Sequence, residues 1–229
     1  FCCVVIAGDL GSGLVVFFSG AIIIMMSGPR KEWVLSTIAI LIGLVALLLA
    51  ADSLVDSIVG RDVLIKAYQM NRLLVFLDPT ADTTGSGYNL MQSLIAVGSG
   101  GFFGKGIGNA TQSASGFLPE AHTDFIFALT SEEFGFVGDM LLLSLFALLI
   151  FSTIRVAYKS DSLFLRLVAV GIVGIWTFQV LENVGMCIGL MPITGIPLPF
   201  ISFGSSSMLM QLANVGIVQS VWRHRSQAR

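Results

Sequence analysis

Long apolar segments limit what this chain can fold into more than any other feature. Several of them carry few or no charges and approach the roughly 20 residues that a helix needs to cross a bilayer core. Hydrophobic residues make up 55% of the chain and charged residues only 11%, whereas soluble domains carry about 25% charged residues. We therefore expect an all-α polytopic membrane protein. The net charge of −2 gives no indication of nucleic-acid binding.

The apolar segments predict about five complete transmembrane helices, with the end of a sixth at the start of the chain. They are placed at residues 14–26, 33–51, 136–154, 167–190 and 208–222. Phe1 to Ala7 reads as the tail of the sixth helix and Gly8 to Gly13 as a turn. The chain is thus interpreted as the C-terminal part of a single membrane domain, residues 1–229, with one long loop at 52–135.

Basic residues set the expected orientation of these helices. Short loops rich in Lys and Arg stay in the cytoplasm. The Arg30-Lys31 turn, the segment 155–166 and the tail from Arg223 all fall on one side of the predicted helices. The C-terminus is therefore expected in the cytoplasm, and the long loop and the proline-rich loop at 191–207 are expected outside it.

Polar side chains gather in the long loop at residues 117–125, and loops of that length are commonly functional. Asp124 is the candidate general base, since an acid lodged among apolar side chains becomes a better proton acceptor near neutrality. His122 could orient it or donate a proton, and Glu120 could bind sugar hydroxyls or a cation. The structural alternative is that Thr123 or Asp124 caps the helix that follows.

Few cations are available outside the membrane. Lys105 and Arg72 are the candidates for binding a phosphate, and the glycines around Lys105 could bring backbone amides to the same anion or could simply form tight turns. Glu182 lies in an apolar segment near Gln179. An ionisable residue in such a place is either part of a functional site or a hydrogen-bonding group in helix packing, and the sequence leaves both open.

Several longer motifs run along nearly the whole chain. They are Asp78-Pro79, Gly85 to Asn89, Gln92 to Gly101, Phe117 to Phe127, Glu132 to Gly135 and Pro192 to Phe200. Together they resemble the SEDS family of cell-wall proteins, whose members include RodA and FtsW. Ala7 to Ser12 and Phe203 to Ser207 depart from the pattern of that family.

The resemblance implies an inverting peptidoglycan glycosyltransferase that polymerises lipid II, both donor and acceptor, at the outer face of the bacterial cytoplasmic membrane. It also implies a class B penicillin-binding protein as partner, and it makes Asp124 the essential acid. The expected substrate-binding residues are Glu120, His122, Lys105, Arg72, Gln112 and Ser202. No cofactor is certain; a divalent cation, Mg or Mn, could steady the pyrophosphate.

Alternatives within and beyond the family stay open. The segments 109–113 and 183–186 look more like RodA, the elongation and cell-shape member, than FtsW, the division member. A lipid II flippase would need a polar path through the membrane, for which Glu182 with Gln179 is the candidate. A scaffold without chemistry is the third possibility. This chain alone is expected to be inactive.

Overall fold

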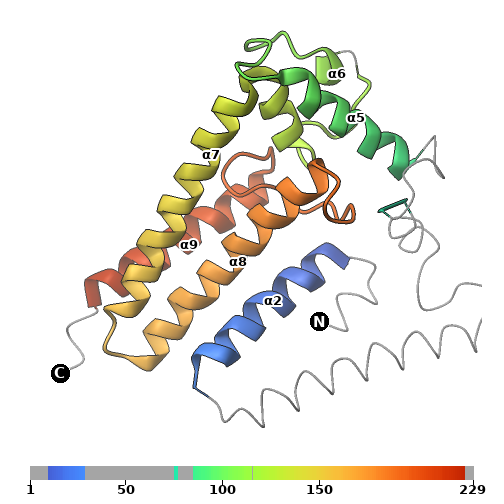
Figure 1. Ribbon diagram of the computed structural model, residues 1–229. Helices are drawn as coiled ribbons and strands as arrows, with labels where there is room; N and C mark the ends of the chain where they lie inside the picture. The colour runs from blue at the N-terminus through green and yellow to red at the C-terminus, as the bar shows by residue number, and fades with distance from the viewer. Residues whose placement is uncertain (1–9, 29–74, 77–84, 115, 225–229) are drawn as a thin grey trace, which may run out of the picture.

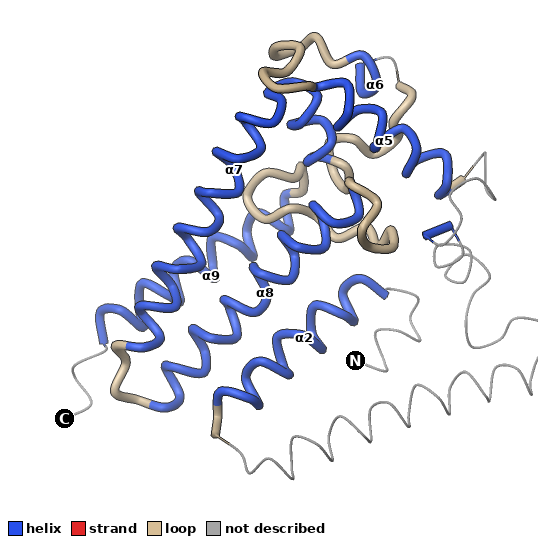
Figure 2. The backbone as a smooth tube through the Cα atoms, viewed as in Figure 1, coloured by secondary structure: helices blue, strands red, loops and turns tan. Residues whose placement is uncertain are grey.

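A computed structural model describes residues 10–28, 75–76, 85–114 and 116–224. Every regular element within these residues is helical, and no strand occurs among them (Figure 2). The labelled helices are α2 (Leu10–Met26), α5 (Ser86–Gly100), α6 (Thr111–Ala114), α7 (Ile126–Tyr158), α8 (Leu163–Cys187) and α9 (Ser205–His224). The predicted span at 33–51 and the candidate Arg72 lie outside the described residues.

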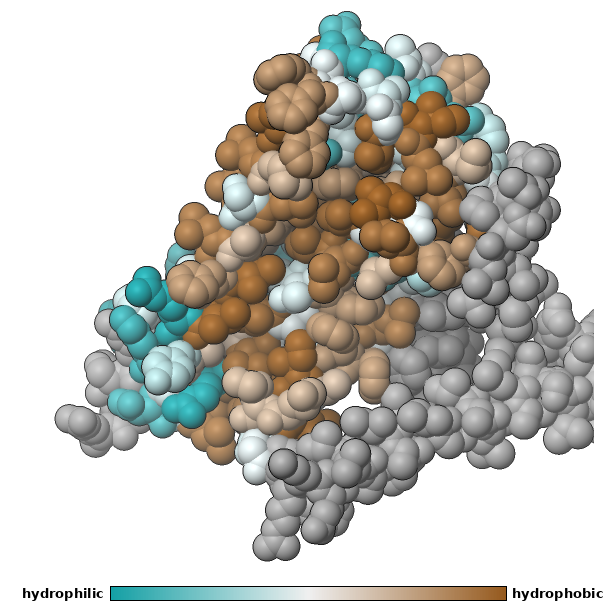
Figure 3. Space-filling view, in the orientation of Figure 1, coloured by the Kyte–Doolittle hydropathy of each residue, from teal (hydrophilic) through white to brown (hydrophobic). Residues whose placement is uncertain are grey.

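Two of the described helices, α7 and α8, are long and apolar enough to cross a membrane. Helix α7 leaves large apolar side chains such as Leu141, Leu145 and Leu148 more than half exposed, and an apolar surface covers α7 and α8 (Figure 3). A helix whose apolar side chains face outward is suited to lipid rather than to water. The predicted segment 136–154 lies within α7, and 208–222 lies within α9.

Helix α2 differs from expectation at its start. The sequence pattern places a turn as far as Gly13, yet the helix already begins at Leu10. The reason is tertiary: a Cβ at Gly11 would press on Ile196 and on the carbonyl of Thr194. Gly11 therefore serves close packing against the proline-rich segment rather than a chain reversal.

Helices α2 and α8 lie side by side and run in opposite directions (Figure 1). Gly174 of α8 faces Ser19, and Gly171 faces Ile23, so small residues let the two backbones approach. Phe18 and Phe178 add a tilted ring contact with centroids 5.0 Å apart.

The chain passes back and forth along the bundle through α7, α8 and α9 (Figure 1). The ammonium of Lys159, just after α7, lies 5.7 Å from the ring centre of Trp222 near the end of α9. The cationic residues of both segments, including Arg155 and Arg223, therefore share one end of the bundle. The opposite end of the bundle holds two connecting segments. Residues 118–125 lead into α7, and residues 188–204 join the end of α8 to the start of α9.

Helix α7 is broken at Gly135, where φ is 67° and ψ is −169°. The break leaves main-chain groups without helical partners, and the loop after α5 supplies them. Lys105 N donates to Glu132 O and Gly106 N to Glu133 O, both at 2.9 Å. In return, Phe136 N donates to Gly101 O at 3.0 Å. The loop 101–110 is thereby joined to α7 along its backbone.

Candidate active site

The turn before α7 holds the predicted catalytic cluster. Leu118, Ala121 and Phe125 are buried in a core that also contains Met186 and Ile193. This three- and four-residue spacing buries one side of the turn and directs the residues between them toward the surface. Within the turn, His122 is exposed and Asp124 half-buried. The core therefore fixes the turn while leaving its polar side accessible.

The geometry of this turn is constrained at Glu120, which has a positive φ of 56° although it is not glycine. Its carbonyl oxygen accepts hydrogen bonds from the main-chain N–H groups of Thr123, Asp124 and Phe125. The hydroxyl of Thr123 donates to the Glu120 carboxylate at 2.9 Å. Phe125 occupies the N-cap position of α7, without a side-chain capping hydrogen bond. The N-cap position that the sequence offered to Thr123 or Asp124 is thus occupied by Phe125.

An open cavity of about 630 Å³ adjoins the turn. Two of its lining residues, His122 and Ile126, flank Asp124 in the sequence, and the others come from the segment leading into α9 and from the first turn of α9. That second set is Ile201, Ser202, Phe203, Gly204, Ser205 and Met208. A largely apolar pocket with a few polar groups at its edge is a common form of ligand site.

Three consecutive carbonyl groups of the turn accept hydrogen bonds from residues outside the turn. Phe203 N donates to His122 O at 2.9 Å, and the Ser202 hydroxyl donates to Thr123 O at 2.7 Å. The side-chain amide of Asn183, in α8, donates to Asp124 O at 2.7 Å. We call these three bonds the carbonyl clamp.

The two side chains of the clamp are buried and have second contacts. Asn183 is fully buried, and its Nδ2 also donates to Ile196 O at 2.8 Å. The Ser202 hydroxyl also accepts the N–H of Leu198 at 2.7 Å. Ser202, which the sequence suggests as a substrate-binding residue, thus has its hydroxyl engaged with two main-chain groups.

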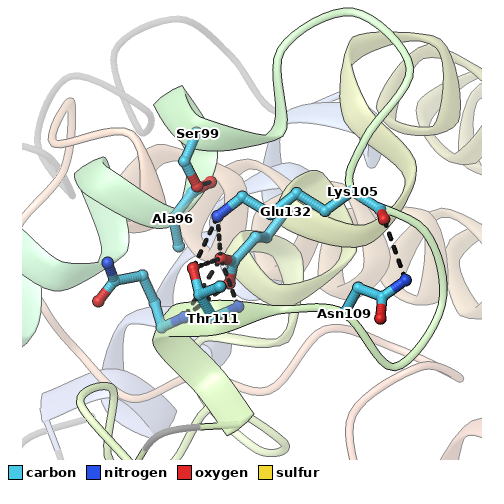
Figure 4. Close-up of polar contacts among 7 residues, drawn as sticks. Ala96, Ser99, Lys105, Asn109, Thr111 and Glu132 are labelled. Atoms are coloured by element: carbon cyan, nitrogen blue, oxygen red, sulfur yellow. Dashed lines mark hydrogen bonds and ion pairs between the residues drawn. The ribbon is translucent and has the colours of Figure 1, made fainter.

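A second polar cluster surrounds Glu132, whose side chain is completely buried (Figure 4). Its Oε1 lies 2.6 Å from the Lys105 ammonium. The same oxygen accepts the N–H and the hydroxyl of Thr111, both at 2.8 Å, and the N–H of Gln112 at 3.2 Å. Lys105 also donates to the Thr111 hydroxyl at 2.7 Å. We call this group the Glu132 knot; it satisfies a buried charge with both a counter-ion and neutral donors.

The knot changes how Lys105 and its glycines are interpreted. Lys105 is paired with Glu132, and the backbone amides expected to approach an anion are bonded within the protein, as when Gly108 N donates to the Glu133 carboxylate at 2.9 Å. The Gln112 carbonyl accepts the N–H groups of Phe117 and Leu118. Lys105 and Gln112 therefore meet at the knot, whereas Glu120, His122, Asp124 and Ser202 meet at the clamp.

Glu182 and Gln179 make contacts of the helix-packing kind. Glu182 Oε1 accepts the hydroxyl of Thr194 at 2.7 Å. Gln179 accepts from the amide of Gln211 at 3.1 Å, and Gln211 in turn accepts from the Trp176 indole at 2.7 Å. Among the residues that the structure describes, no three His, Cys, Asp or Glu side chains gather to hold a metal ion.

The predicted site lacks two side chains that are central to these clusters, Glu132 in the knot and Asn183 in the clamp. The sequence presents Glu132 as an acid near the start of a span and part of the motif 132–135, and Asn183 as a neighbour of Glu182 and part of the segment 183–186, without a site role for either. The available signal for Asn183 was its polarity within an apolar helix, where an amide needs hydrogen-bond partners. Nothing in the local sequence shows that those partners belong to residues 124 and 196.

Comparisons with known proteins agree over almost the whole chain. A family model described as FtsW, RodA and SpoVE cell cycle protein matches residues 1–227. The peptidoglycan glycosyltransferase MrdB of Escherichia coli K12 is 41% identical over 217 residues, covering 95% of this chain and 55% of MrdB. The stage V sporulation protein E of Bacillus subtilis is 40% identical, covering 94% of this chain and 55% of that protein.

A solved structure supports the same relationship. A chain of a peptidoglycan synthase complex, described as coordinating polymerisation and crosslinking, matches with a TM-score of 0.69 and 33% identity. The match covers 96% of this chain and 57% of that one. The chain thus spans about half the length of the proteins it matches.

Proposed function

This chain belongs to the FtsW, RodA and SpoVE family of cell cycle proteins, and we propose that it carries the active-site acid of a peptidoglycan glycosyltransferase. The substrate is lipid II, which is polymerised into glycan strands. One observation carries the proposal: Asp124 lies in a turn that is fixed by the carbonyl clamp and borders the 630 Å³ cavity. His122 and Ile126 line the cavity and Asp124 lies between them in the same turn. Proton transfer to or from a bound substrate requires an acid held in a fixed position close to the substrate.

The reaction joins two sugars. A hydroxyl of the acceptor attacks the anomeric carbon of the donor, the bond from that carbon to the lipid pyrophosphate breaks, and the new glycosidic bond forms with inversion. Asp124 accepts the hydroxyl proton as the bond forms. The apolar residues Ile201, Phe203 and Met208 along the cavity suit the isoprenoid part of the substrate.

The leaving pyrophosphate needs positive charge near it. Lys105 is paired with Glu132, so Arg72, which lies outside the described residues, is the better of the two predicted cations. A divalent cation, Mg or Mn, stays a prediction: such ions bind phosphates with one or two carboxylates, and the described residues assemble no three-ligand site. The reaction as written routes no step through a metal.

The protein is proposed to act in the bacterial cytoplasmic membrane, with the clamp end outside and the cationic end, including Arg155 and Arg223, in the cytoplasm. A class B penicillin-binding protein is the proposed partner that crosslinks the strands. Elongation and cell shape, the RodA role, are the proposed context. Relatives named MrdB and FtsW are 41% and 37% identical to this chain, so the division role of FtsW remains the alternative within the family.

The proposal is tested by lipid II polymerisation with the full-length protein purified with its partner, while transpeptidation is blocked. Asp124→Asn keeps the size of the side chain and removes the base, so we expect the rate to fall by about 10²–10⁴-fold. The matched control is Asp161→Asn, an exposed acid in the loop between α7 and α8 at the cationic end. The control is expected to polymerise like the wild type.

Equal strand synthesis by wild type and Asp124→Asn would remove Asp124 as the base. It would return the site to a binding or transport role. Thermal unfolding and co-purification of the partner show whether each variant is folded and assembled, so a loss of activity is not confused with loss of the protein.

A further inference from the structure

We propose that Asn183 and Ser202 are positioning residues that set the main chain of Asp124, an inference that rests on the proposed function. Neither side chain needs to touch substrate in this role. Each acts by fixing one carbonyl of the turn that carries the acid, Asn183 at Asp124 and Ser202 at Thr123.

The first support is that the clamp joins parts of the chain that are distant in sequence. Asn183 comes from α8, 59 residues after Asp124, and Ser202 follows Thr123 by 79 residues. Both bonds are 2.7 Å long. Both donors are buried, with exposures of 0% and 5%. Buried donors of this kind are held in place by packing and therefore transmit their own position to the turn.

The second support is that the hydrogen bonds fall on consecutive residues. Carbonyls 122, 123 and 124 are consecutive, and each accepts from a different donor: Phe203 N, Ser202 Oγ and Asn183 Nδ2. Three successive peptide planes, each held at its own oxygen, have little freedom to rotate. Because every bond ends on a main-chain oxygen, the clamp fixes the position of the acid without using its carboxylate.

The third support is backbone conformation. The described residues include two non-glycine positions with positive φ, Glu120 at 56° and Phe200 at 64°. One lies in each of the two turns that the clamp joins. Such conformations cost about 1–3 kcal/mol and persist where surrounding contacts over-determine them. The clamp provides contacts of that kind for both turns.

Asn183 has a further link that extends its role. Its Nδ2 also donates to Ile196 O, in the proline-rich segment before the cavity residues. One amide therefore ties the turn of the acid to the segment that lines the pocket. Replacing this amide should shift Asp124 relative to the bound substrate, and a shift of about 1 Å can lower a rate about 100-fold.

The test compares two buried amides in the full-length protein purified with its partner. Asn183→Leu removes the donor at close to constant volume. Gln211→Met is the matched control, because Gln211 is also a buried amide that bridges two helices, but its hydrogen bonds join Trp176 and Gln179 of α8 rather than the turn. Both variants should unfold at a lower temperature than wild type. Only Asn183→Leu should lower kcat, by about 10–100-fold with KM changed less than about threefold.

A second pair keeps the inference testable if Asn183→Leu does not fold. Ser202→Ala removes the hydroxyl that bridges Thr123 O and Leu198 N, whereas Ser202→Thr retains it. We expect kcat to fall with the alanine and to be largely restored by the threonine.

The outcomes separate the inference from the function on which it rests. If wild type polymerises lipid II and Asp124→Asn does not, but the clamp variants keep kcat, the inference is wrong and the function stands. Equal loss of kcat in Asn183→Leu and Gln211→Met would also refute it, since general destabilisation would explain both. If wild type forms no strands, the proposed function itself fails.

Discussion

The Glu132 knot and the carbonyl clamp both hold a loop against the helices, but they differ in what they hold. The knot gathers donors around one buried carboxylate, and one of those donors is the charged Lys105. The clamp places neutral donors, led by the Asn183 amide, on three main-chain oxygens. In the knot, the charged groups of Lys105 and Glu132 bind each other. The clamp instead fixes the main chain of residues 122–124.

The difference separates two roles for polar residues in an apolar protein. A buried carboxylate that loses its counter-ion is strongly destabilising, so the knot is expected to govern stability. A carbonyl that loses one neutral donor costs less energy but lets the turn move, so the clamp is expected to govern the geometry of the acid. Lys105, predicted from sequence as a phosphate ligand, lies in the first network.

The largest expected effect comes from breaking the knot. Lys105→Met leaves the Glu132 carboxylate buried without a counter-ion, and we expect a loss of about 3–5 kcal/mol in stability. Lys159→Met, which removes an exposed ammonium, is the control. Thermal unfolding of the full-length protein in detergent measures both.

Lys105→Met also tests the phosphate-binding role that the sequence predicts for Lys105. An unchanged unfolding temperature together with a raised KM would return Lys105 to phosphate binding and contradict the knot. Combining Lys105→Met with Glu132→Gln should restore much of the stability, because Gln retains an acceptor for Thr111 and Gln112 but carries no charge.

The next largest effect concerns the main-chain contact between α7 and the loop after α5, beside the knot. A Cβ at Gly135 would overlap the Gly104 nitrogen, and the residue also has a positive φ of 67°. Gly135→Ala is expected to cost about 2–5 kcal/mol, from strain of about 1–2 and overlap of about 1–3. Gly101→Ala carries the strain without the overlap, since φ is 59° and no atom lies within 4 Å of a Cβ there. Equal unfolding temperatures for the two variants would show that the close approach is unimportant.

The smallest expected effect comes from Glu133, the acid next to Glu132 in the sequence. Glu133 is only partly buried and accepts the Gly108 N–H at 2.9 Å. Glu133→Gln keeps an acceptor there, so we expect a change below about 1 kcal/mol in unfolding free energy. If Glu133→Gln lowered the unfolding free energy as much as Lys105→Met, the burial of Glu132 would not explain why the knot matters for stability.

The sequence alone determined the helical class and the family, and it singled out Asp124 as the candidate acid. Apolar segments at 136–154 and 208–222 predict helices because a long apolar run with few charges has few other stable environments. The residues 117–125 stand out because two acids, a histidine and a hydroxyl crowd together there among apolar side chains. These are properties of composition and spacing, so they can be read without coordinates.

Tertiary structure decided the partners of the polar side chains. The local pattern offered Lys105 to a phosphate and Ser202 to substrate, yet their nearest partners are Glu132 and Thr123. It gave Asn183 no specific role, and it placed a turn where Gly11 packs within a helix. A donor bonds with whichever acceptor the packing brings within reach, and residues separated by 27 to 79 positions meet only after the helices have assembled.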